Sequence, residues 1–246
     1  MDAALKELAP TGVLRVAIAV GPPGSPMWAT RDAASGEPRG VTLDLGAALG
    51  GKLGVPVSFV AYASTGEITE AADKDAWDVS FMPVDEERKK RVDFGPNYSL
   101  GESTYLIAPG VAAGSVADVD RLGMRVVGVE NTTTIRAARR SLKHATVSGA
   151  TGANDTLALM RSGKADAIAL GRDTLDIFAA ELPGARVLED HFWAVGIAIA
   201  VRKGMPAALA YASEFIEAAK ADGTVQRAFD AARLKGAKLA PAGSRS

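Results

Sequence analysis

Residues 81–98 read FMPVDEERKKRVDFGPNY, and this stretch joins an apolar run to seven consecutive charged residues, Asp85 to Arg91. Asp85 is a residue type that caps helix N-termini, and the order of acids before bases complements the helix dipole. Glu86 and Lys90 are four residues apart, which is the spacing of a favourable pair on a helix. The stretch therefore predicts a short helix directly after a buried strand.

Outside this stretch, apolar runs rich in β-branched residues alternate with helical patterns. We expect strands at 14–20, 57–62, 77–82, 124–129, 145–147, 165–170 and 196–201. We expect helices at 43–53, 68–72, 135–142, 156–160 and 207–220, and a last helix between 224 and 235. This alternation is typical of an α/β protein with parallel sheets, here in two sets. The tail, 235–246, is rich in Gly, Pro, Ala and Ser, and we expect it to be frayed.

Composition excludes several classes of function. The chain of 246 residues is 48% hydrophobic and carries a net charge of −1, so no basic field favours nucleic acid. It contains no cysteine and two histidines, which excludes disulfides and multi-histidine metal sites. The longest apolar run, 192–201, is too short to span a bilayer. We expect no cofactor and no membrane span.

The first residues, MDAALKELAPTG, contain neither a basic n-region nor an apolar h-region. Two interpretations of localisation follow from this. The protein is periplasmic if a signal peptide was removed before Met1, and cytoplasmic if Met1 is the native start.

The stretch DEERKKRVDFGPNY, 85–98, resembles the T-x-E-R-x-x-x-V-D-F-S-x-P-Y signature of periplasmic solute-binding proteins of the polar amino-acid family. Further pieces resemble the same family in the same order: LRVAIA, GEPRGVTLDLGAALGGKLG, WDVSFMPV, MRVVGVENTTT, GKADAIAL, AVGIAIAVRKG and ADGTVQRAF. The resemblance covers 13–234. It implies a type II periplasmic-binding-protein fold with two α/β lobes, each a mostly parallel sheet flanked by helices, and a ligand cleft between them. Lobe 1 would comprise 1–105 and 195–246, lobe 2 would comprise 106–194, and hinge strands would lie near 102–108 and 194–200.

The resemblance also implies a binding role for Arg88. In the family, the arginine of the E-R pair projects into the cleft and contacts the carboxylate of the ligand. A guanidinium suits this role because it presents parallel N–H donors to a carboxylate and stays charged. The alternative from the residues alone is a solvated surface helix, in which Arg88 has no ligand.

In lobe 2, Asn131, Thr132, Thr133 and Thr134 follow a predicted strand and open a predicted helix. Relatives have a Gly- and Thr-containing turn here that meets the same carboxylate, so the resemblance implies a ligand role for these residues. A helix N-terminus adds a favourable dipole for an anion. Plain N-capping by threonine or asparagine is the alternative interpretation.

Two departures from the family pattern bear on the ligand. Relatives place one acid after the first strand and one after the strand of GKADAIAL, where this chain has Ala19 and Gly171, with Asp173 displaced by two residues. A buried ammonium without a carboxylate partner is costly, so the pattern predicts a small carboxylate without an α-amine, such as a keto, hydroxy or aromatic acid. The family's Gly-x-Thr is replaced here by the residues at 81–83, which begin with Phe81. Trp28, Phe81 and Tyr98 would line the apolar side of the ligand, although burial in the core explains each of them equally well.

We expect a monomeric, non-catalytic binding protein that closes at its hinge and delivers its solute to an ABC permease if it is exported. Two alternatives remain open. Cyclohexadienyl and arogenate dehydratases resemble the same family, and such an enzyme needs a general acid, for which Glu130, Asp173 and His191 are conceivable candidates. A cytoplasmic ligand-binding or sensor relative is the other alternative.

Overall fold

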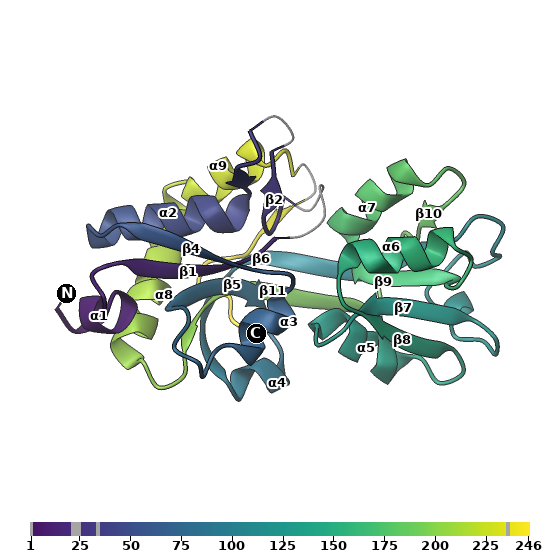
Figure 1. The fold of residues 1–246 in the computed structure, drawn as a ribbon, viewed down its shortest axis with the longest axis horizontal. Helices are drawn as coiled ribbons and strands as arrows, with labels where there is room; N and C mark the ends of the chain where they lie inside the picture. The colour runs from purple at the N-terminus through teal and green to yellow at the C-terminus, as the bar shows by residue number, and fades with distance from the viewer. Residues whose placement is uncertain (1, 21–25, 33–34, 235–236) are drawn as a thin grey trace. The chain divides into compact units, whose positions relative to one another are not determined.

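The computed structural model describes residues 2–20, 26–32, 35–234 and 237–246. The chain forms two compact units (Figure 1). Unit 1 comprises Met1–Leu100 and Val195–Ser246, and unit 2 comprises Gly101–Ala194. The chain passes from one unit to the other within strand β6 (Val92–Ile107) and returns within β11 (Trp193–Arg202).

Unit 1 is built on a sheet in the order β4-β1-β5-β11. Strands β1 (Leu14–Ala19), β4 (Val57–Tyr62) and β5 (Val79–Pro83) are parallel, and β11 runs antiparallel to β5. A two-stranded ribbon is formed by β2 (Thr30–Arg31) and β3 (Pro38–Arg39). The carboxyl ends of β1, β4 and β5 share one edge of the sheet, which is where open α/β sheets bind ligands.

The helices of unit 1 cover both faces of this sheet. Apolar residues of α1 (Asp2–Leu8), α2 (Val41–Leu53), α8 (Pro206–Ala221) and α9 (Thr224–Ala231) pack with Val16 and Ile18 of β1. The alternate residues Ala17 and Ala19 pack with α3 (Thr65–Glu70) on the other face. The longest described helix, α8, has 16 residues, and no helix in the described part of the chain is long and apolar enough to cross a membrane.

Unit 2 repeats this arrangement on a sheet in the order β6-β9-β7-β8. Strands β7 (Arg125–Val129), β8 (Thr146–Ala150) and β9 (Ala167–Gly171) are parallel, and both β6 and the short β10 (Arg186–Val187) complete the sheet in antiparallel pairs. Helix α5 (Thr133–Ser141) packs on the face of Val126, and α6 (Ala153–Arg161) and α7 (Arg172–Glu181) pack on the face of Val127. A single 3-10 turn, η1 (Ala117–Val119), precedes β7.

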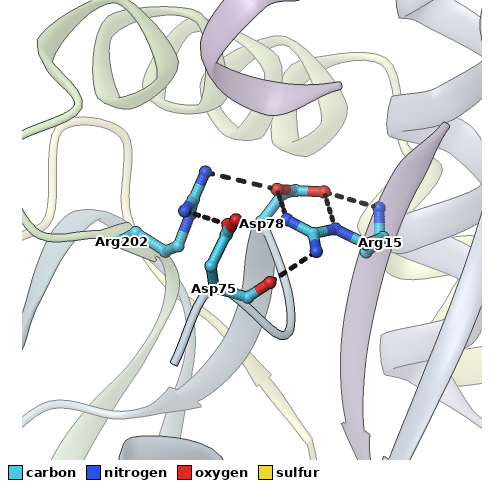
Figure 2. A network of polar contacts seen from close by, with 4 residues as sticks. All are labelled: Arg15, Asp75, Asp78 and Arg202. Atoms are coloured by element: carbon cyan, nitrogen blue, oxygen red, sulfur yellow. Dashed lines mark hydrogen bonds and ion pairs between the residues drawn. The ribbon is translucent and has the colours of Figure 1, made fainter. Parts of the chain in front are cut away.

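An arginine–aspartate clamp joins β1 to the start of β5 in unit 1 (Figure 2). Asp78 is buried and accepts hydrogen bonds of 2.7–3.0 Å from the backbone N–H, Nε and Nη2 of Arg15. The Asp78 N–H donates in return to the Arg15 carbonyl over 2.9 Å. Arg202, at the end of β11, forms ion pairs with Asp75 and Asp78. The clamp therefore fixes three neighbouring strands at their ends.

Unit 2 contains the same clamp. Asp166 precedes β9 as Asp78 precedes β5, and it accepts hydrogen bonds of 2.6–2.9 Å from the backbone N–H, Nε and Nη2 of Arg125. Arg125 Nη1 donates to the carbonyl of Gly163, three residues before Asp166, as Arg15 Nη1 donates to the carbonyl of Asp75. The two units therefore share one local construction at corresponding strands.

The C-terminal segment is ordered on unit 1, which corrects the expectation of a frayed tail for the described residues 237–246. Strand β12 (Lys238–Leu239) pairs with the Ser99–Leu100 part of β6, and the Asn97 N–H donates to the Ser244 carbonyl over 2.8 Å. The ammonium of buried Lys220 donates to the carbonyls of Asn97 and Pro241. These contacts satisfy backbone groups that a frayed tail would leave to solvent. The first two residues of the predicted tail, 235–236, lie outside the described part of the chain.

Candidate functional site

The charged stretch after β5 forms the predicted short helix, α4 (Glu86–Lys89). Asp85 is its N-cap, and its side chain accepts a hydrogen bond from the Arg88 N–H over 2.8 Å. The predicted pair between Glu86 and Lys90 is wrong: Glu86 pairs with Lys89, and Glu87 pairs with Lys90. Residues three and four apart are both neighbours on a helix, so either spacing can pair, and this helix uses the shorter one.

Arg88 lies at the carboxyl edge of the unit 1 sheet and is only 1% exposed, so the stretch is not simply a solvated surface helix. Its Nη1 donates to the carbonyl of Pro83 over 2.9 Å, and its Nη2 donates to the Thr65 hydroxyl over 2.8 Å. Pro83 ends β5, and Thr65 begins α3 directly after β4. The guanidinium is therefore held inside the edge at which β4 and β5 end.

The predicted aromatic residues lie in the apolar interior of unit 1. Phe81 is 1% exposed and meets the buried Tyr98 edge to face, with ring centroids 5.8 Å apart. Trp28 is half-buried and packs against both apolar clusters of the unit. Core packing accounts for Phe81 and Tyr98 in this structure, and the ligand contacts of Phe81 and Trp28 remain predictions.

The turn after β7 contains the predicted lobe 2 residues. Asn131 has a left-handed backbone with φ of 60°, and the Thr132 side chain caps α5 by accepting from the Ile135 N–H. The Thr134 hydroxyl lies 3.0 Å from the Ser103 hydroxyl. Thr133 is buried, and among the described residues its hydroxyl has no hydrogen-bond partner. Capping thus explains Thr132, and the ligand roles of these turn residues remain predictions.

Gly171 ends β9 in register with Ser103 of β6, so the structure brings Ser103, Thr134 and Gly171 together in unit 2. A Cβ at Gly171 would stand 2.9 Å from Asp173 Oδ1. Asp173 therefore occupies the space that an acidic side chain at residue 171 would enter. In unit 1, Ala19 ends β1 and is 7% exposed, with its methyl group in the cluster around α3.

Of the acids considered for catalysis, Glu130 forms an ion pair. Both carboxylate oxygens of Glu130 accept from Arg139, over 2.8 and 2.9 Å, and this bidentate bond lowers the pKa of Glu130. A general acid at neutral pH needs a raised pKa, so Glu130 is a poor candidate. His191 lies exposed after β10.

Thr65 contacts Arg88 and Ser103 contacts Thr134, and neither Thr65 nor Ser103 was predicted from the sequence. Thr65 lies at the start of a helix that directly follows a strand, a position that often faces a ligand edge. This location, after a predicted strand and before a predicted helix, could have marked Thr65 as a candidate site residue. No comparable pattern marks Ser103, because its contact depends on the pairing of β6 with β9.

The sequence pattern of the family described as bacterial extracellular solute-binding proteins, family 3, matches residues 16–231. An ancestral amino acid-binding protein, AncCDT-1, described as a precursor of cyclohexadienyl dehydratase, is similar at 26% identity and a TM-score of 0.79, over 92% of this chain and 97% of that chain. The solute receptor for L-cysteine of Neisseria gonorrhoeae has a TM-score of 0.82 at 23% identity, over 94% and 93% of the two chains. An amino acid ABC transporter substrate-binding protein, AbpA from Streptococcus pneumoniae, bound to L-arginine, has a TM-score of 0.79 at 18% identity, over 92% and 96%. No curated protein sequence matches the chain.

Proposed function

We propose that this chain, which belongs to the bacterial extracellular solute-binding proteins of family 3, binds a small carboxylate-bearing solute and delivers it to an ABC importer without chemical change. Localisation outside the cytoplasm and a partner permease are parts of this proposal. Hinge closure on the ligand, which the resemblance implies, also remains a prediction.

The observation that carries the proposal is the placement of Arg88. Its guanidinium is buried at the carboxyl edge of the parallel strands and is oriented by Pro83 and Thr65. A guanidinium suits this role because it presents parallel N–H donors to the two oxygens of a carboxylate and stays charged.

The threonine turn of unit 2 supplies a second set of donors for an anion. Thr133 opens α5, a helix of nine residues, and its hydroxyl is not engaged by the described part of the chain. The first N–H groups of a helix carry a partial positive charge and favour carboxylates. We therefore assign Thr133, rather than the capping Thr132, as the hydroxyl that meets the ligand.

Ala19 and Gly171 support a ligand without an α-ammonium group, because neither provides a negative charge. An amino acid is the second candidate, and one observation favours it: Asp173 Oδ1 lies where a side chain at residue 171 would begin. Solved structures similar to this chain include the arginine-bound and cysteine-binding proteins above. The two candidates differ in whether the ligand carries a positive charge near Asp173.

Thermal unfolding in the presence of two ligand panels tests the proposal. The acid panel contains benzoate, phenylpyruvate, pyruvate and L-lactate, and the amino-acid panel contains L-arginine, L-cysteine and L-glutamine. A bound acid at a hundredfold excess over its Kd should raise Tm by about 5–10 °C, and benzamide, which lacks the charge, should not. A rise in Tm with the amino acids alone would show that the ligand is an amino acid, the second candidate. An unchanged Tm with both panels would reject carboxylate binding.

A further inference from the structure

A threonine at the start of α3 holds one side of the Arg88 guanidinium. The Thr65 hydroxyl accepts a hydrogen bond of 2.8 Å from Nη2, and both residues are buried, with 8% and 1% of their surfaces exposed. The other terminal nitrogen, Nη1, donates to the Pro83 carbonyl at the end of β5. Because the two bonds start from different nitrogens of one rigid plane, together they fix the orientation of that plane.

The position of Thr65 is itself fixed by the local structure of α3. Ser64 caps the helix by accepting from the Glu67 N–H over 3.2 Å, and Glu67 Oε2 accepts from the Ala63 N–H over 2.9 Å. The Thr65 carbonyl accepts from the Thr69 hydroxyl over 2.9 Å. Thr65 is thus the first helical residue of a doubly capped turn, and its hydroxyl is presented from a rigid element.

We propose that Thr65 is a positioning residue, which holds the Arg88 guanidinium in the orientation that receives the ligand carboxylate; the inference rests on the proposed function. An arginine side chain that is already ordered loses less conformational entropy when it binds. Loss of the Thr65 hydroxyl should release one side of the guanidinium and weaken carboxylate binding without removing any charge.

Three substitutions test the proposal. Thr65→Val removes the hydroxyl at nearly constant volume, and Thr65→Ser retains it. Thr156→Val is the matched control, because it removes the hydroxyl of a buried helical threonine in unit 2 that bonds to the Ala153 carbonyl and does not contact Arg88. For each panel ligand that the wild type binds, calorimetry should show a Kd about tenfold higher for Thr65→Val, a value within about twofold for Thr65→Ser, and no change for Thr156→Val. If Thr65→Val does not fold, Thr65→Ala removes the same hydroxyl without adding an apolar branch.

A second readout separates positioning from mere support of the fold. In spectra of protein labelled with ¹⁵N-arginine, the Nε–H signal of Arg88, assigned with Arg88→Lys, should exchange with water faster in Thr65→Val than in the wild type and Thr65→Ser. Equal affinity of Thr65→Val and the wild type for the bound acids would overturn the role of Thr65 while the proposed function stands. A rise in Kd for Thr65→Ser as large as that for Thr65→Val would also overturn the role of Thr65. A wild type that binds no ligand of either panel would overturn the proposed function, and the role of Thr65 with it.

Discussion

The carboxylate of Asp173 lies against Gly171, so closely that a Cβ at residue 171 would stand 2.9 Å from Asp173 Oδ1. The negative charge missing from position 171 of the sequence is therefore found two residues later, in the first turn of α7. Whether that charge faces a ligand amine distinguishes the two candidate ligand classes.

If the ligand lacks an α-ammonium, Asp173→Asn should leave the affinity for panel acids within about twofold or strengthen it, because a negative charge does not attract a carboxylate. Any residual affinity for L-arginine should fall. Isothermal titration measures both, with Asp176→Asn on the same helix as the control. A large loss of acid binding in Asp173→Asn alone would contradict this assignment.

The two arginine–aspartate clamps should differ in their contribution to stability. Asp78 is fully buried and lies between Arg15 and Arg202, whereas half of the Arg125 side chain is exposed beside Asp166. Asp78→Asn should therefore lower the free energy of unfolding by about 3 kcal/mol, since it breaks a buried charge network. Asp166→Asn should have a smaller effect, because solvent screens an exposed pair. Urea unfolding of both variants checks the order, and a larger loss for Asp166→Asn would contradict it.

The stability of unit 2 should depend on pH through Asp120. The backbone N–H of His144, together with those of Ala145 and Lys143, lowers the pKa of Asp120 to about 2. A carboxyl with a lowered folded pKa stabilises the protein above its unfolded pKa of about 3.9, and this contribution is lost as the pH falls toward the folded value. The Tm difference between wild type and Asp120→Asn should thus be constant above about pH 5 and shrink between pH 4 and 2. A difference that does not change with pH would refute this coupling.

The C-terminal segment should contribute measurably to the stability of unit 1. Deletion of 238–246 removes β12 and leaves the buried ammonium of Lys220 without the carbonyl of Pro241. A buried donor that loses a partner costs about 1–3 kcal/mol, so Tm should fall by several degrees. Differential scanning calorimetry of the shortened and the full chain measures the change. An unchanged Tm after the deletion would show that the segment is not held as described.

Local patterns predicted most of the elements. The strand at 57–62 has the predicted bounds, and Asp85 caps the helix after β5, because alternation and capping depend on neighbours in the sequence. Helix α7 was missed, since Gly171 gives no capping side chain at its start. Strand β6 begins ten residues before its predicted part, because Gly95, Pro96 and Gly101 interrupt the strand pattern.

Contacts between distant segments could not be predicted in the same way. The bond between Thr65 and Arg88 requires that β4 and β5 flank β1, and the bond between Ser103 and Thr134 requires that β6 pair with β9. Hydrophobic periodicity specifies the type of an element but not its neighbours in a sheet. The family resemblance predicted a binding role for Arg88. The residues that orient its guanidinium, Thr65 and Pro83, became evident only from the structure.

The central claim is that the Arg88 guanidinium receives the ligand carboxylate. Isothermal titration of the acid panel into wild type and Arg88→Lys tests it most directly, with Arg91→Lys in the same charged stretch as the matched control. Arg88→Lys keeps the charge but loses the planar pair of donors, so the Kd of every bound acid should rise at least about tenfold, while Arg91→Lys should bind as the wild type does. Equal affinity of the wild type and a folded Arg88→Lys for those acids would contradict the claim.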